Sequence, residues 1–163
     1  MLPRNVSIRH NLKPGDIGYL TYLHGVLYAK ELGWDYTLEP YVAVPLSSFA
    51  QSHTEREQIW IVEKEAMLAG AIAIVEASRE AAQLRWLLLH PNLRGQGVGK
   101  ILVAEAITFC KLHGYSSVFL WTVSSLPAAA HIYQSTGFKL TQEKPPAAIW
   151  GALVIEQRYE LRL

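Results

Sequence analysis

The segment from Ala82 to Val123 constrains the fold more than any other part of this chain. A strand is predicted from Ala82 to Leu89, where His90-Pro91-Asn92 ends it, and its part from Leu84 to Leu89 is nearly apolar throughout, as expected of a strand buried on both faces. A glycine-rich stretch, Arg94-Gly95-Gln96-Gly97-Val98-Gly99-Lys100, then leads into a helical pattern from Gly99 to Leu112 and an apolar strand from Val118 to Val123. A strand, a helix and a strand in succession predict a parallel pair of strands joined by a helical crossover.

The rest of the sequence predicts further strands and helices around that unit. No internal repeat, low-complexity tract or linker divides the chain, so residues 1–163 are expected to form a single α+β domain around a mixed sheet. Alternating or β-branched residues predict strands at Val6–His10, Gln58–Glu63, Ala69–Ala77, Phe138–Gln142 and Leu153–Leu161. Periodic apolar residues with flanking glycine or proline predict helices at Ile17–Leu32, Tyr41–His53 and Pro127–Thr136.

Composition excludes several classes of protein and partner. Half of the residues are hydrophobic, which is too many for a disordered chain, and no apolar run reaches the ~18 residues of a membrane span. The net charge of +1 predicts no nucleic-acid partner, and the absence of an apolar leader predicts a cytoplasmic protein without membrane attachment. Cys110 is the only cysteine and the histidines are scattered, so no disulfide and no metal site are expected.

The glycine-rich stretch has the chemistry of a phosphate-binding loop. Three glycines in five positions allow the backbone to approach a ligand, and the N–H groups that begin a helix converge on an anion. A dinucleotide fingerprint does not fit, because the third glycine comes one residue early, and a P-loop does not fit, because Ile101 follows Lys100. A simple glycine-rich turn is the alternative, although Arg94 and Lys100 add charge that a turn does not need.

Three segments resemble the GNAT family of acyl-CoA-dependent N-acetyltransferases. Arg94-x-x-Gly97-x-Gly99 is similar to the family's pyrophosphate-binding motif, and the run from Ala129 to Phe138, with Tyr133 inside it, resembles its second signature. The segment His24–Asp35 resembles GNAT domains that are fused to MarR-type winged helices in bacterial proteins, here in a free-standing form. The resemblance implies a GNAT fold, a mixed and mostly antiparallel sheet of about six or seven strands flanked by about four helices, with a splayed central parallel pair.

The resemblance also implies where acetyl-CoA, the co-substrate, would bind. Its pantetheine arm would lie along the backbone where the strand that ends at Leu89 splays from its neighbour, and an N–H near Leu88 would act as an oxyanion donor. Tyr133 would be the general acid that protonates the departing sulfur, with packing as its alternative role. The residues assigned to cofactor binding are Leu87, Leu88, Leu89, Arg94, Gly95, Gln96, Gly97, Val98, Gly99, Lys100, Ala129 and Tyr133.

The sequence indicates less about the part of the site that would bind the amine than about the part that would bind acetyl-CoA. His24, Tyr28 and Glu31 lie along one side of the first predicted helix and are the candidates for a base or a substrate contact, the alternative being packing and surface roles. The family often has asparagine where this chain has Leu126, so Ser124 or Ser125 would have to replace that polar contact. Arg85 either reaches the acceptor groove or forms a structural ion pair.

Three other residue types carry expectations without a catalytic role. The place of Glu105 in the apolar stripe of its helix suggests a buried partner. Cys110 is expected to be a small core residue rather than a nucleophile, and the five tryptophans are expected in the core or at an interface.

The function implied by the resemblance is transfer of an acetyl group to a primary amine. The amine would attack the thioester directly in a ternary complex, with no covalent enzyme intermediate, and the acceptor would be a small molecule or a peptide. Transfer of a longer acyl group is a second enzymatic reading, and a non-catalytic module that senses acyl-CoA is the alternative from another class. A homodimer is compatible with all of these.

Overall fold

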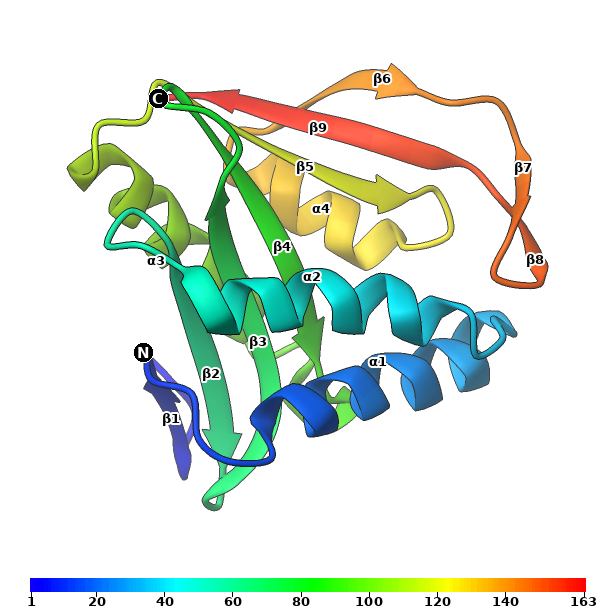
Figure 1. Ribbon diagram of the computed structural model, residues 1–163, viewed down its shortest axis with the longest axis horizontal. Coiled ribbons are helices and arrows are strands. Elements are labelled where there is room, and N and C mark those ends of the chain that lie inside the picture. The colour runs from blue at the N-terminus through cyan, green and yellow to red at the C-terminus, as the bar shows by residue number, and fades with distance from the viewer.

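The computed structural model describes all residues, 1–163, and shows four α-helices and nine strands (Figure 1). The helices are α1 (Asp16–Leu32), α2 (Leu38–Ser52), α3 (Val98–Leu112) and α4 (Pro127–Ser135), with a 3₁₀ turn, η1, at Pro91–Leu93. The strands are β1 (Val6–Arg9), β2 (Gln58–Lys64), β3 (Met67–Glu76), β4 (Ala81–Leu89), β5 (Ser117–Val123), β6 (Lys139–Glu143), β7 (Ala147–Ile149), β8 (Ala152–Val154) and β9 (Glu156–Arg162).

Seven strands form one mixed sheet in the order β1-β2-β3-β4-β5-β9-β6. Every neighbouring pair is antiparallel except β4 and β5, which are parallel. The strand, helix and strand at the centre of the chain therefore form the predicted parallel pair, with α3 as the crossover. Figure 1 shows β4 and β5 diverging along their length, so the predicted splay of this pair is confirmed.

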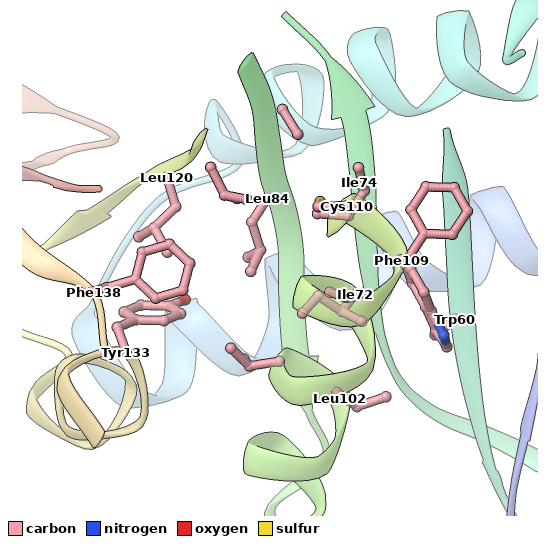
Figure 2. Close-up of a cluster of buried hydrophobic side chains, with 14 of the residues drawn as sticks. Trp60, Ile72, Ile74, Leu84, Leu102, Phe109, Cys110, Leu120, Tyr133 and Phe138 are labelled. Carbon is pink, nitrogen blue, oxygen red and sulfur yellow. The ribbon is translucent and has the colours of Figure 1, made fainter. Parts of the chain in front are cut away.

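Helices cover both faces of the sheet, and each face has its own hydrophobic core. On one face, α1 and α2 pack Leu20, Leu46 and Phe49 against Ala71 and Ala73 of β3. On the other face, α3 and α4 bury a larger cluster that includes Leu102, Phe109, Cys110 and Tyr133 (Figure 2). The alternation of β3 explains both cores, because successive side chains of a strand point to opposite faces.

Two expectations from sequence are wrong in detail. The strand predicted at Leu153–Leu161 is divided at Ile155 into β8, which pairs with β7 in a separate hairpin, and β9, which pairs with β5 and β6 in the main sheet. Glu105 has no buried partner, because its side chain is exposed on α3. Cys110 is fully buried, as expected of a core residue, and burial raises the pKa of its thiol to about 12.

None of the four helices is both long and apolar enough to cross a bilayer. No group of three or more histidine, cysteine, aspartate or glutamate side chains is placed to hold a metal ion.

Candidate active site

A bulge in β4 opens the centre of the sheet. Ala71 pairs with Leu88 and Ala73 pairs with Arg85, so two residues of β4, Trp86 and Leu87, lie opposite one residue of β3. Trp86 has a φ of 55°, in the left-handed region that tryptophan rarely adopts. An extra residue in one strand bends that strand and increases its twist, so the bulge turns the end of β4 away from β5.

Pairing between β4 and β5 is short. The two strands are in register only from Ala81 to Gln83 on β4 and from Ser117 to Phe119 on β5. Beyond that point a cavity of about 120 Å³ lies between them, lined by residues of both strands and of α1, α2 and α4. Backbone groups of β4 past Gln83 have no strand partner on this side, which is the position that the resemblance assigns to the pantetheine arm.

The glycine-rich loop leads from the end of β4 to the beginning of α3. Gly95 and Gly97 both have positive φ angles, 72° and 80°, and Gly97 caps the helix. The first intrahelical hydrogen bond is donated by the Ile101 N–H to the Gly97 carbonyl, so the N–H groups of Val98, Gly99 and Lys100 have no partner within the helix. No side chain caps them and the first turn contains no acidic residue. An anion is therefore the ligand that this end of α3 favours.

Gly99 has a different role from Gly97. Its φ is not in the left-handed region, and a Cβ placed on it would lie 2.8 Å from Cδ1 of Ile132 on α4. The missing side chain lets α3 approach α4 closely, and this approach fixes the helix that carries Tyr133.

Arg94 connects the loop to α1. Its Nη1 donates to Oε1 of Glu31 at 2.6 Å, and its Nε donates to the carbonyl oxygen of Leu89 at 3.0 Å. The sequence pattern placed Arg94 and Glu31 on opposite sides of the reaction, Arg94 with phosphate and Glu31 with the amine. In the structure Glu31 is instead the ion-pair partner of Arg94 beside the loop.

Tyr133 lies on α4, is 5% exposed, and lines the cavity between β4 and β5. Figure 2 shows its ring beside Phe138, with the hydroxyl oxygen directed toward the middle of the buried cluster. Burial raises the pKa of this phenol well above its ordinary value, and the neighbouring Tyr28 and Tyr159 act in the same direction. The hydroxyl therefore keeps its proton at neutral pH, as a proton donor must.

His24 lines the same cavity and is 3% exposed. Its Nδ1 lies 2.7 Å from the carbonyl oxygen of Leu20, which only accepts hydrogen bonds, so Nδ1 carries the proton and Nε2 is left as an acceptor. Burial lowers the pKa of the ring to about 4, so His24 is neutral at pH 7.

Tyr28 lies on the next turn of α1, with its ring 6.0 Å from that of His24. Burial raises the pKa of Tyr28 to about 12. The structure thus brings His24, Tyr28 and Tyr133 together, and Glu31, paired with Arg94, lies near enough for its charge to act on Tyr28.

His24 should make the stability of the protein depend on pH. Between pH 6.5 and about 4 the unfolded chain binds more protons at this histidine than the folded chain, so the free energy of unfolding falls as the pH falls. The loss is on the order of 3 kcal/mol across that window and is absent above it. Urea unfolding of the wild type and of His24→Asn, at pH 7.5 and at a pH of about 4.5, measures it.

His24→Asn keeps an N–H donor near the Nδ1 position but does not titrate. Its unfolding free energy should change much less with pH than that of the wild type. Parallel pH profiles for the two proteins would contradict a neutral buried His24.

The opposite wall of the cavity contains residues that sequence did not assign to a site. Trp150 and Gly151 join β7 to β8 in a two-residue turn, with φ angles of 53° and 75°. The Asp35 N–H donates to the Trp150 carbonyl at 2.8 Å and fixes the hairpin to the loop between α1 and α2. The rings of Trp34 and Tyr41 lie 4.6 and 5.1 Å from that of Trp150. The Trp150-Gly151 pair between two short apolar runs is the one feature of the sequence that indicates this hairpin.

Four further residues either line the cavity or lie outside it. Leu126, which replaces the family's asparagine, lines the cavity, whereas Ser124 and Ser125 are exposed and do not. Glu156 also lines it, and no pattern in the sequence had marked it. Its carboxylate receives a hydrogen bond of 3.1 Å from Nζ of Lys144.

The model of the acetyltransferase (GNAT) family matches residues 26–138, which is more than half of the chain. The protein belongs to the GNAT family. The match includes the bulged strand, the loop and the Tyr133 helix. A match to the whole family does not test the more specific resemblance to GNAT domains fused to MarR-type winged helices.

The curated relatives of this GNAT protein include N-acetyltransferases of a fungus and of a mammal. It is 29% identical to an uncharacterized N-acetyltransferase of Schizosaccharomyces pombe, over 87% of this chain and 88% of that protein. It is 34% identical to N-acetyltransferase family 8 member 3 of Rattus norvegicus, over 52% of this chain and 39% of the rat protein. The chain thus spans well under half of the rat relative.

Solved GNAT structures share the fold at low sequence identity. An acetyltransferase from Streptococcus agalactiae superposes with a TM-score of 0.77 at 18% identity, over 99% of this chain and 100% of that one. A GNAT family acetyltransferase from Elizabethkingia anophelis with acetyl-CoA bound gives 0.67 at 15%, covering 99% and 100%. Spermidine N-acetyltransferase from Vibrio cholerae, in complex with CoA and spermine, gives 0.73 at 17%, covering 98% and 96%.

Proposed function

We propose that this GNAT protein transfers the acetyl group of acetyl-CoA to a primary amine by direct attack in a ternary complex. The observation that carries the proposal is the early end of β4–β5 pairing at Gln83 and Phe119. The opening it leaves runs toward Leu89, and from there the chain leads into the uncapped first turn of α3. An extended thioester and an anionic pyrophosphate thus have adjoining places along one continuous stretch of chain.

The two ends of acetyl-CoA would be bound by different backbone groups. The N–H groups from Gln96 to Lys100 would hold the pyrophosphate at the positive end of the α3 dipole. Backbone groups of Leu87, Leu88 and Leu89 would pair with the pantetheine arm as an added strand does. An N–H near Leu88 would stabilise the negative charge that develops on the thioester oxygen during attack.

The reaction needs one proton donor and one route for proton loss. The neutral amine attacks the thioester carbonyl carbon, the C–N bond forms and the C–S bond breaks. Tyr133 donates its phenolic proton to the departing sulfur, giving the free thiol of CoA, and recovers a proton from water. The nitrogen loses one proton to solvent to become the amide.

Of the three predicted residues on the amine side, His24 fits best as a contact to the nucleophile. Its Nε2 is an acceptor on the wall that also contains Tyr133, and it can accept a hydrogen bond from the amine N–H, which orients the lone pair. A ring whose pKa is about 4 does not hold a proton at pH 7, so the ammonium is deprotonated by water before attack. The turnover rate should therefore rise with pH until the neutral amine prevails. Glu31 is assigned to the Arg94 ion pair instead.

Two measurements test the proposed function. Isothermal titration should show binding of CoA and acetyl-CoA at sub-millimolar concentration, and an amine panel should release thiol in proportion to N-acetyl product. Absence of binding at near-millimolar CoA would remove the proposal. Binding without thiol release across the panel would favour the acyl-CoA-sensing module. Comparing the turnover of acetyl-, propionyl- and succinyl-CoA identifies the acyl group that the enzyme transfers best.

The setting of the enzyme also belongs to the proposal. Four points remain predictions. The acceptor is a small-molecule or peptide amine, the location is cytoplasmic, the protein is a homodimer, and its origin is bacterial with kinship to MarR-fused GNAT domains.

A further inference from the structure

Arg85 is a half-buried cation without an anionic partner. Four other arginines, at positions 9, 56, 94 and 158, form ion pairs with carboxylates, and the remaining three are exposed. Burial lowers the pKa of Arg85 and Tyr41 is the only neighbour that opposes this effect, so no carboxylate offsets the cost of placing its charge there. The structural ion pair that the sequence allowed for Arg85 does not exist.

Arg85 lies at the wall of the cavity between β4 and β5, on the face of the sheet that α1 and α2 cover. Five consecutive residues of β4, from Gln83 to Leu87, line this cavity, and Arg85 also lines a second cavity beside α2. The guanidinium carbon of Arg85 lies 5.0 Å from the centre of the Trp86 ring. The next residues along the chain, Leu87 to Leu89, are those assigned to the thioester arm. A group bound by Arg85 therefore lies close to the reacting carbonyl.

Arg85 is the one unpaired charge of the cavity. The other formal charge on its lining is Glu156, which is paired with Lys144 at 3.1 Å. His24 is neutral at pH 7 because burial lowers its pKa to about 4. An arginine that lines a partly desolvated cavity favours a carboxylate, because its planar guanidinium group can donate two parallel hydrogen bonds to the two carboxylate oxygens.

The remainder of the lining is apolar and aromatic. Trp34 and Trp150 pack at 4.6 Å, Tyr41 packs on Trp150 at 5.1 Å, and Leu38 and Val42 of α2 complete this side. The hydrogen bond from the Asp35 N–H to the Trp150 carbonyl holds the tip of the β7–β8 hairpin to the loop between α1 and α2. The aromatic wall is therefore formed before any ligand binds. Such a wall favours an apolar or aromatic substituent on the acceptor.

We infer that the acceptor is a free α-amino acid with an apolar or aromatic side chain, and that Arg85 binds its carboxylate. This inference rests on the proposed function and specifies its acceptor. Arg85 is a specificity-determining residue in this arrangement, the wall of Trp34, Tyr41 and Trp150 receives the side chain, and the amine faces the end of the splay. A site built around a buried cation rejects an acceptor that lacks the anion, because the cation is then left unpaired.

Matched acceptors test the inference in the wild-type enzyme. L-Phenylalanine, L-phenylalaninamide and 2-phenylethylamine share the aromatic group and the amine but differ in the carboxylate. With kcat/KM expressed per unprotonated amine, phenylalanine should exceed the other two by roughly 10- to 100-fold. Equal values for the three acceptors would overturn the inference while leaving the proposed function in place. No turnover of any of the three, with CoA binding intact, would also overturn it.

Variants show whether the preference comes from Arg85. Arg85→Gln should reduce kcat/KM for phenylalanine to the level of phenylalaninamide and raise kcat/KM for 2-phenylethylamine, because no unpaired cation is left beside that acceptor, and Arg85→Lys should be intermediate. Arg79→Gln removes the same charge from an exposed position and should behave as wild type. A preference for phenylalanine that survives in folded Arg85→Gln would contradict the assignment. Circular dichroism reports on folding, and if Arg85→Gln does not fold, the wild-type comparison decides.

Discussion

Replacing Tyr133 with phenylalanine is expected to lower kcat by roughly 10²- to 10³-fold, the range that loss of a positioned general acid produces. Only the hydroxyl is removed, and the ring keeps its contacts with Phe138 and Tyr159 at 6.0 and 5.9 Å between centroids. The hydroxyl acts after the co-substrate is bound, so the CoA dissociation constant should change less than about twofold. Steady-state thiol release with saturating acetyl-CoA measures kcat, and titration calorimetry measures CoA affinity.

A second buried tyrosine of the same core supplies the control. Tyr159 is 3% exposed and packs on Tyr133, but it does not line the cavity. Tyr159→Phe should therefore retain wild-type kcat, which separates loss of the proton donor from disturbance of the core. If Tyr133→Phe turned over amines as fast as wild type, the departing sulfur would have to take its proton from water or another group.

The fold was predictable from sequence where local pattern and tertiary packing agree. The nearly apolar run from Leu84 to Leu89 in β4 and the periodic residues of α3 each indicate an element without knowledge of its neighbours, and the structure confirms both elements. The run from Leu153 to Leu161 indicates one strand, yet Ile155 divides it between two sheets. That division depends on where the β7–β8 hairpin docks, and a strand pattern carries no such information.

The candidate site likewise contains features that the sequence predicts and features that it does not. Anion binding at the glycine-rich loop could be predicted because the N–H groups that would donate, from Gln96 to Lys100, belong to consecutive residues. The ion pair between Glu31 and Arg94 joins residues 63 positions apart, so the spacing of residues on one helix could not predict it. Similarly, the positive φ of Trp86 marks a bulge that brings this ring to the same face of the sheet as Arg85, and that backbone conformation leaves no mark in the composition of the strand.

A charge introduced at Gly97 should nearly abolish CoA binding without unfolding the protein. Gly97 has a φ of 80°, no atom lies within 4 Å of the position that a Cβ would take there, and asparagine and aspartate are the side chains that best tolerate this conformation. Gly97→Asn and Gly97→Asp have nearly the same shape and differ in charge. The carboxylate would lie beside the N–H groups of Val98, Gly99 and Lys100 and repel the pyrophosphate. Gly97→Asp should bind CoA at least ~100-fold more weakly than Gly97→Asn.

The same pair of substitutions at the other end of α3 isolates the effect of position. Gly114 has a φ of 77° and equally open surroundings, so Gly114→Asn and Gly114→Asp test strain and charge away from the proposed pyrophosphate site. These two variants should bind CoA alike and as tightly as wild type. Because the repulsion is electrostatic, the difference between the two Gly97 variants should narrow as salt rises from about 0.05 to about 0.5 M. Equal CoA affinity for Gly97→Asn and Gly97→Asp at low salt would mean that the pyrophosphate does not bind at the beginning of α3.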